Sequence, residues 1–96
     1  MVGMLAVIIT IRGRVQGVGF RWWATNEARY LNLSGHAENK ADGSVEIRAQ
    51  GEDEAVGRMI RLTLEDPTTT SRPGRIEDYD LTWTEVIPGA KAFGYR

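Results

Sequence analysis

The sequence contains no cysteine. This absence excludes a disulfide framework and any metal site that depends on thiolate ligands. An excess of charge of one sign is also lacking, because 12 Lys and Arg residues against 13 Asp and Glu residues leave a formal net charge of −1. Proteins that bind nucleic acids or anionic membranes over a broad surface need a strong positive field. A site for an anion in this chain must therefore be local.

Long hydrophobic runs are absent as well. The most apolar stretch, MVGMLAVIIT, is followed closely by Arg12 and is shorter than the roughly 20 residues of a membrane span. It has neither the basic start nor the Ala-x-Ala cleavage pattern of a signal peptide. We expect a buried first strand and a cytoplasmic location, which the lack of cysteine permits.

The 96 residues are enough for one small domain and too few for two, so we expect one domain over residues 1–96. Residues 5–12 are nearly continuously apolar and rich in β-branched side chains, which predicts a central strand. A helix is predicted next, ending near Asn32 or Gly35. Its buried face would be Phe20, Ala24, Ala28 and Leu31, which recur at helical spacing.

A hairpin and a second helix follow. Asp42-Gly43 is a turn signal, and the alternation after it predicts a half-buried strand. The inward residues of this strand would be Val45, Ile47 and Ala49. EDEAVGRMIRLTLED predicts a helix whose acidic first turn suits the helix dipole without a metal. The buried stripe of this helix would be Val56, Met59 and Ile60.

The last third of the chain predicts one long strand and a short one. After the polar loop PTTTSRPG, the segment RIEDYDLTWTEV alternates through Tyr79, Leu81 and Trp83. Ile76 is out of phase with them, which predicts a bulge or a late start of the strand. The tail KAFGYR can add an edge strand.

The order β-α-β-β-α-β predicts the α+β class. We expect a ferredoxin-like sandwich, with two helices on one face of a mainly antiparallel sheet of four or five strands. Enzymes, RNA binders and regulatory modules share this fold, so the function must be argued from the site.

Residues 13–21, GRVQGVGFR, place three glycines between the first strand and the first helix. At such a junction helix amides point outward, and glycines let successive N–H groups converge on an anion. Arg21 adds a planar charged fork that suits two phosphate oxygens. Glycine spacing alone is equally typical of a tight turn beside a surface arginine. The spacing is not G-x-G-x-x-G, and no Lys-Ser or Lys-Thr follows, so a small phosphate group fits better than a nucleotide.

GRVQGVGFR, followed after the helix by LNLSGHAENKADGSVEI, resembles the acylphosphatase family over most of the chain up to Pro67. The resemblance implies a small enzyme that hydrolyses the carboxyl–phosphate bond of acyl phosphates without a metal, a nucleotide, another cofactor or a covalent intermediate. It implies Arg21 as the catalytic arginine and Asn39 as the catalytic asparagine. The backbone amides of the phosphate loop would belong to Arg14, Val15, Gln16, Gly17, Val18, Gly19 and Phe20.

These residue types suit that reaction. A phosphoryl transition state spreads charge over its equatorial oxygens, which positioned amides and a guanidinium stabilise. The leaving carboxylate needs no strong general acid, and neutral Asn39 can orient a water for in-line attack. We expect the proton of that water to pass to a phosphate oxygen of the substrate, because neither motif contains an obvious base. Outside this motif, an asparagine would more commonly bond its own backbone.

The chain departs from the family pattern at His36-Ala37-Glu38, where the family usually has an aromatic, a small apolar and often a basic residue. We expect His36 to be a surface or packing residue, and alternation turns Glu38 away from Asn39. The tryptophans are expected to pack in the core rather than to stack on nucleic-acid bases: Trp22, Trp23 and Trp83.

Other functions remain alternatives. One is a non-catalytic anion-binding module of the kind fused to hydrogenase maturation factors, although Arg21 and Asn39 together favour the enzyme. An RNA-binding module would need aromatic residues on the central strands, and AVIITI and SVEIRA have none. A small-molecule regulatory domain would not call for an arginine after the glycine loop. We therefore expect a monomer that binds an acyl phosphate and inorganic phosphate, with no nucleic-acid or membrane partner.

Overall fold

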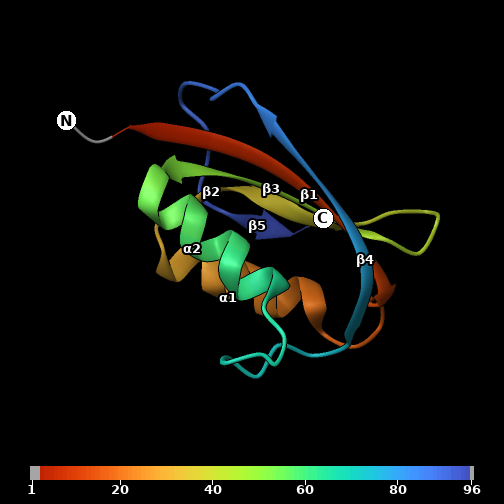
Figure 1. Ribbon diagram of the computed structural model, residues 1–96. Helices are drawn as coiled ribbons and strands as arrows, with labels where there is room; N and C mark the ends of the chain where they lie inside the picture. The colour runs from red at the N-terminus through yellow and green to blue at the C-terminus, as the bar shows by residue number, and fades with distance from the viewer. Residues whose placement is uncertain (1–2, 96) are drawn as a thin grey trace.

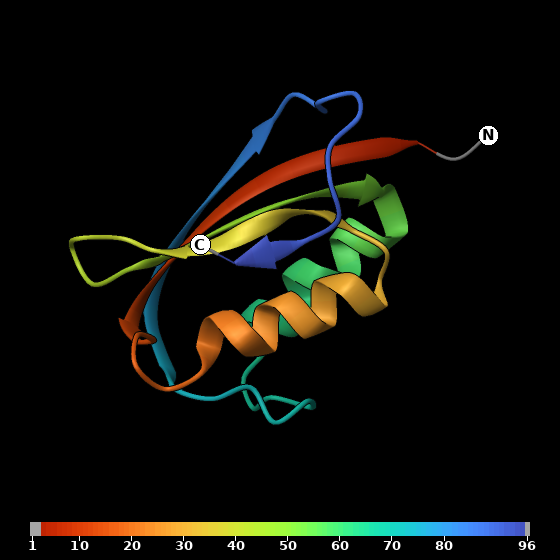
Figure 2. The same ribbon diagram turned by 180° about the vertical axis from the view of Figure 1, so that it is seen from behind.

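The computed structural model describes residues 3–95. Its elements, in chain order, are β1 (Met4–Arg14), α1 (Phe20–Tyr30), β2 (Ser34–Asn39), β3 (Val45–Glu52), α2 (Asp53–Leu64), β4 (Arg75–Thr84) and β5 (Gly94–Tyr95). The sheet has the strand order β4-β1-β3-β2-β5. Every strand pair is antiparallel except β2 with β5. Both helices cover the same face of the sheet (Figure 1; Figure 2). The predicted ferredoxin-like sandwich is confirmed, and the tail adds its short edge strand beside β2.

The core lies between the sheet and the two helices, and local sequence patterns predict most of it. Val45, Ile47 and Ala49 of β3 are buried as expected, and they face the same side as the inward residues of β1. Of the stripe expected for the first helix, Phe20, Ala24 and Ala28 are buried in α1, and Leu31, which directly follows α1, is only partly buried. Phe93 is also almost fully buried. Its burial was not predicted, because a single aromatic residue in a short tail is not part of a periodic apolar pattern.

Helix α2 buries more residues than its sequence stripe indicated. Val56 and Met59 are buried, Ile60 is partly buried, and Leu62 and Thr63 join them. The hydroxyl of Thr63 donates a 2.7 Å hydrogen bond to the carbonyl oxygen of Met59, so this polar side chain is satisfied inside the helix. No helix within residues 3–95 is long and apolar enough to cross a membrane.

The predicted bulge lies where β1 pairs with β4. Arg12 is opposite Asp78, but Gly13 is opposite Ile76, so one extra residue of β4 is left between these pairs. A Cβ atom on Gly13 would come within 2.3 Å of the carbonyl oxygen of Arg75. Glycine at position 13 is therefore needed for the two strands to approach each other at the bulge.

The expectation that all three tryptophans pack in the core is correct only for Trp23. Trp23 is 5% exposed, and its indole N–H donates a hydrogen bond to the hydroxyl of Thr70 at 3.2 Å. Trp22 is 65% exposed because it lies off the buried stripe of α1. Trp83 is 55% exposed, although it is paired with buried Val7. It is exposed because β4 is the edge strand, and the helices pack mainly against the inner strands (Figure 1).

Candidate active site

The start of helix α1 is built to leave its amides open. Gly17 and Gly19 have φ angles of 74° and 91°, a left-handed conformation that side chains disfavour. Gly19 occupies the N-cap position, where no side-chain hydrogen bond caps the helix, and the first turn contains no acidic residue. The first turn of α2, in contrast, holds Asp53 and Glu54. The positive end of the α1 dipole is therefore left to attract an anion from outside the helix.

A small hollow lies at this helix start and has a volume of about 170 Å³. Its lining residues are Val15, Gly17, Gly19, Phe20, Arg21, Trp22 and Asn39. The fold thus brings Arg21 and Asn39 to one place, together with most of the glycine loop. Sites for drug-sized ligands have volumes of roughly 300–1,000 Å³. This hollow is smaller and suits a group of the size of a phosphate.

The structure does not bring every expected loop residue to the hollow. Among the described residues, Arg14, Gln16 and Val18 are not part of its lining. Arg14 is the last residue of β1 and is exposed, whereas Val18 packs against the core. The side chain of Gln16 is directed toward the turn between β2 and β3.

Asn39 is the last residue of β2 and is paired with Val45 of β3. Ala37, two residues earlier, is fully buried, which confirms the expected alternation along β2. The side-chain oxygen Oδ1 of Asn39 is buried and accepts no hydrogen bond from the described residues. An unsatisfied buried acceptor costs about 1–3 kcal/mol. A water or an O–H group in the hollow would relieve this cost by donating to Oδ1.

Gln16 connects the glycine loop to the β2–β3 turn. Its Nε2 donates hydrogen bonds to the carbonyl oxygens of Lys40 and Ser44, each at 2.8 Å. Because Lys40 follows Asn39 directly, these bonds fix the end of β2 opposite the loop. The resemblance implied a role only for the backbone of Gln16, so this side-chain function was missed. The only signal in the sequence was a long amide side chain between the apolar residues Val15 and Val18 of the loop.

The turn that Gln16 contacts is itself well bonded. The backbone N–H of Lys40 donates to the carbonyl oxygen of Ser44 at 2.8 Å. Oδ1 of Asp42 accepts hydrogen bonds from the hydroxyl and the backbone N–H of Ser44, at 2.6 and 2.9 Å. These bonds lower the pKa of Asp42 below the ordinary value of 3.8. They keep the turn, and with it Asn39, in one position.

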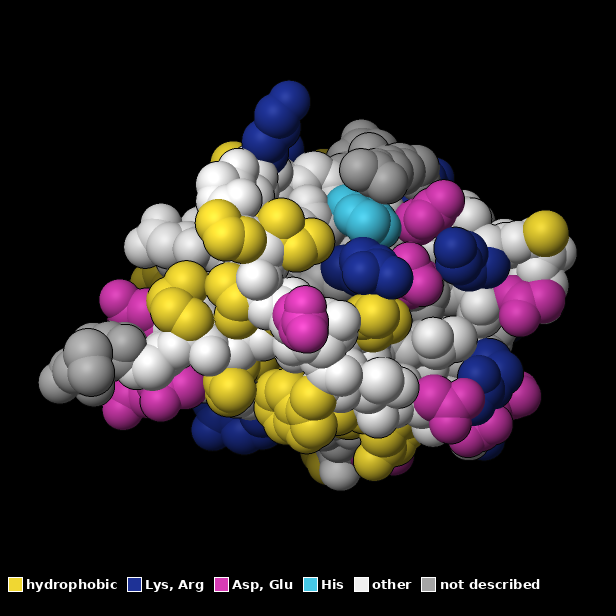
Figure 3. Space-filling view, turned by 90° about the horizontal axis from the view of Figure 1, so that it is seen from above, with side chains coloured by type: hydrophobic (Ala, Val, Ile, Leu, Met, Phe, Trp, Pro, Cys, Tyr) yellow, Lys and Arg dark blue, Asp and Glu magenta, His cyan; other side chains and the backbone are white. Residues whose placement is uncertain are grey.

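His36 lies on the open face of the sheet and not in the hollow. Its Nε2 is 3.7 Å from a carboxylate oxygen of Glu38 and 3.7 Å from one of Glu46. Figure 3 shows acidic and basic side chains gathered around the single histidine. The ammonium group of Lys40 lies within 3.8 Å of both carboxylates, and Arg48 contacts Glu46. The group is therefore an ion-pair network, although its three potential metal-ligand atoms lie within 4.8 Å of one another.

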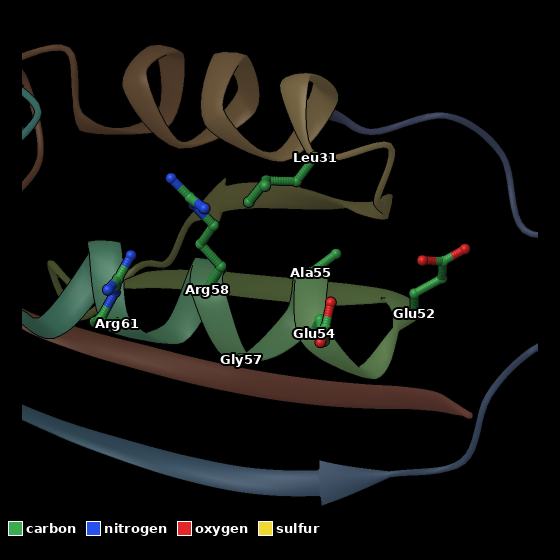
Figure 4. Close-up of a pocket in the computed structure, with 7 residues that line it drawn as sticks. All are labelled: Leu31, Glu52, Glu54, Ala55, Gly57, Arg58 and Arg61. Atoms are coloured by element: carbon green, nitrogen blue, oxygen red, sulfur yellow. The ribbon is translucent and has the colours of Figure 1, made fainter. Parts of the chain in front are cut away.

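Two larger hollows lie elsewhere on the molecule. One of about 550 Å³ lies between the helices, where Leu31 faces Arg58 and Arg61 across the gap (Figure 4). Glu52 and Glu54 line its other end, so it carries both signs of charge. The second, of about 720 Å³, lies between the end of α2 and β4. Neither contains a residue that the sequence had predicted for a site.

The fold and the small hollow define a ferredoxin-like protein with a phosphate-sized hollow at a strand–helix junction. A model of the family "Acylphosphatase" matches residues 7–94. The chain therefore belongs to the acylphosphatase family, as the resemblance of its motifs had implied.

Individual relatives agree with this assignment. The chain is 41% identical over 75 residues to a protein named acylphosphatase from Corynebacterium glutamicum, covering 78% of this chain and 80% of that one. It is 30% identical to the crystal structure of acylphosphatase from Bacillus subtilis, with a TM-score of 0.81 and coverage of 96% and 98%. It also resembles part of full-length HypF in a phosphate- and nucleotide-bound form, with 30% identity and a TM-score of 0.84. That match covers 100% of this chain and 12% of HypF.

Proposed function

We propose that this protein hydrolyses small acyl phosphates to a carboxylate and inorganic phosphate, without a metal or another cofactor. The observation that carries the proposal is the hollow in which Arg21 and Asn39 meet at the uncapped start of α1. Membership of the acylphosphatase family supports the same reaction.

The proposed reaction begins with binding of the phosphoryl group. The open amides at the start of α1 and of the loop from Arg14 to Phe20 donate hydrogen bonds to its oxygens. The guanidinium group of Arg21 contacts two of these oxygens and neutralises their charge. Donors fixed in advance in this way stabilise the transition state more than the ground state, because charge accumulates on the equatorial oxygens.

The attacking group is a water molecule held by Asn39. The acceptor Oδ1 takes one hydrogen bond from this water and directs its oxygen toward phosphorus. As the new O–P bond forms, the bond between phosphorus and the acyl oxygen breaks, and its electron pair leaves on the carboxylate. The proton of the water passes to a phosphate oxygen. His36 takes no part, because it lies on the open face of the sheet.

The proposed site is complete within one chain, which supports a monomeric enzyme formed by residues 1–96. The near-neutral net charge of −1 favours small-molecule ligands over a nucleic acid. The likeness to part of HypF, in a structure described as phosphate- and nucleotide-bound, keeps one alternative in view, an anion-binding module without catalysis. The two functions differ in one measurable property, since only the enzyme releases phosphate from an acyl phosphate.

Hydrolysis of benzoyl phosphate in the presence of EDTA tests the proposal. We expect turnover by the wild type, and losses of about a hundredfold or more in Arg21→Gln and Asn39→Ala. Arg58→Gln and Asn26→Ala are matched controls, because both residues are exposed on helices and lie outside the hollow. Binding of inorganic phosphate without hydrolysis by the wild type would favour the module. Full activity in both folded site variants would reject the assigned residues.

A further inference from the structure

Trp22 has a property that phosphate binding does not explain. It lines the hollow together with Arg21 and Asn39, yet it is 65% exposed. A large aromatic residue is normally buried at least in part, since its apolar area is costly to leave in water. Helix α1 already has its buried face, which includes Phe20 and Trp23. Trp22 therefore does not contribute its ring to the core.

The size of the hollow determines which part of a substrate can contact the side chain of Trp22. At about 170 Å³ the hollow has room for little more than the phosphoryl group of a substrate. The acyl group is attached to that phosphoryl group and must extend out through the opening. Arg21 and Asn39 supply the polar groups of the lining, and Trp22 supplies an exposed aromatic surface.

We propose that Trp22 is the binding surface for the acyl group, so that the enzyme prefers acyl phosphates with an aromatic or extended apolar acyl chain. This inference rests on the proposed acylphosphatase activity. An aromatic acyl group gains both apolar burial and ring–ring contact against the indole. An acetyl group is too small to cover the ring and gains little. Trp22 is a residue of substrate specificity, and the chemistry at phosphorus does not require it.

The test compares two substrates, benzoyl phosphate and acetyl phosphate, in the wild type, Trp22→Ala and Trp22→Phe. Trp83→Ala is the matched control, because Trp83 is also exposed but lies on the edge strand β4. We expect Trp22→Ala to raise the KM for benzoyl phosphate by roughly 3- to 10-fold, the size of one aromatic contact. In Trp22→Ala, the KM for acetyl phosphate and the inhibition constant for inorganic phosphate should change much less than the KM for benzoyl phosphate. Trp22→Phe should retain most of the preference, and Trp83→Ala all of it.

The outcomes separate this inference from the proposed function. A wild type that hydrolyses neither substrate contradicts the acylphosphatase activity itself. A wild type that hydrolyses both, with equal effects of Trp22→Ala on the two substrates or no effect on either, overturns the role of Trp22 and leaves the activity intact. A loss that appears equally in Trp83→Ala would show a general effect of removing an exposed indole, and would also overturn it.

Discussion

The side-chain amide of Gln16 donates a 2.8 Å hydrogen bond to the carbonyl oxygen of Lys40, the residue that follows Asn39. A second bond of the same length reaches the carbonyl oxygen of Ser44. The glycine loop and the β2–β3 turn are thus joined by one side chain. The geometry of the candidate site depends on this connection, because Arg21 and the glycine loop lie at the start of α1, whereas Asn39 lies at the end of β2.

Gln16→Ala should therefore weaken phosphate binding and lower kcat/KM without removing any side chain that contacts substrate. The expected loss is about 10-fold or more in kcat/KM, since small displacements of a catalytic group are costly. Gln50→Ala is a close control, because Gln50 exchanges two hydrogen bonds with the backbone of Ile87 at the other end of the sheet. Both variants should lose stability to a similar degree. Equal activity of Gln16→Ala and Gln50→Ala would contradict the positioning role.

Two glycines provide a test of the backbone at the start of α1. An added Cβ atom would meet no described heavy atom within 4 Å at either Gly19 or Gly57. Gly19, however, has a φ of 91°, whereas Gly57 lies inside helix α2. Gly19→Ala should cost about 1–2 kcal/mol of stability, because side chains disfavour the left-handed conformation. Gly57→Ala should gain about 0.5–1 kcal/mol, because alanine is the better helix former.

Urea unfolding of the two glycine variants measures this difference. Gly57→Ala should also retain full activity, since its neighbours line a different hollow. Gly19→Ala should lose phosphate affinity, because its strain distorts the backbone that lines the small hollow. Equal stability changes in the two variants would mean that the left-handed backbone at Gly19 carries no cost.

The turn beside Asn39 should show a defined dependence on pH. Hydrogen bonds from Ser44 lower the pKa of Asp42 in the folded protein below the ordinary value of 3.8. The folded state then binds this proton less tightly than the unfolded state, so the carboxylate stabilises the fold above pH 3.8. This contribution is lost as the pH falls through the lower pKa of the folded state.

Asp42→Asn should therefore be less stable than the wild type at pH 6, and the difference should narrow below pH 3.8. Urea unfolding of both proteins at a series of pH values measures the gap. A difference that stays constant down to the lowest pH would contradict the assignment of the effect to the Asp42 carboxylate.

Local patterns in the sequence predict much of this fold. The turn at Asp42-Gly43 and the inward face of β3 follow from neighbouring residues, and both are found as expected. The exposure of Trp83 was not predictable in this way, because it depends on β4 being the edge strand. The bond from Gln16 to Lys40 spans 24 residues, so no periodicity or turn signal contains it. The motifs indicated the residues of the proposed site, and the tertiary structure was needed to find how these residues are held.

The central claim is a division of roles, in which Arg21 and the loop hold phosphate and Asn39 orients the attacking water. The most direct test measures the kcat of Asn39→Ala with benzoyl phosphate alongside its inhibition constant for inorganic phosphate. The account predicts that kcat falls by about a hundredfold or more, while the inhibition constant stays within about threefold of the wild type. Asn39→Ala with unchanged kcat and much weaker phosphate inhibition would contradict it, because Asn39 would then be a phosphate ligand only.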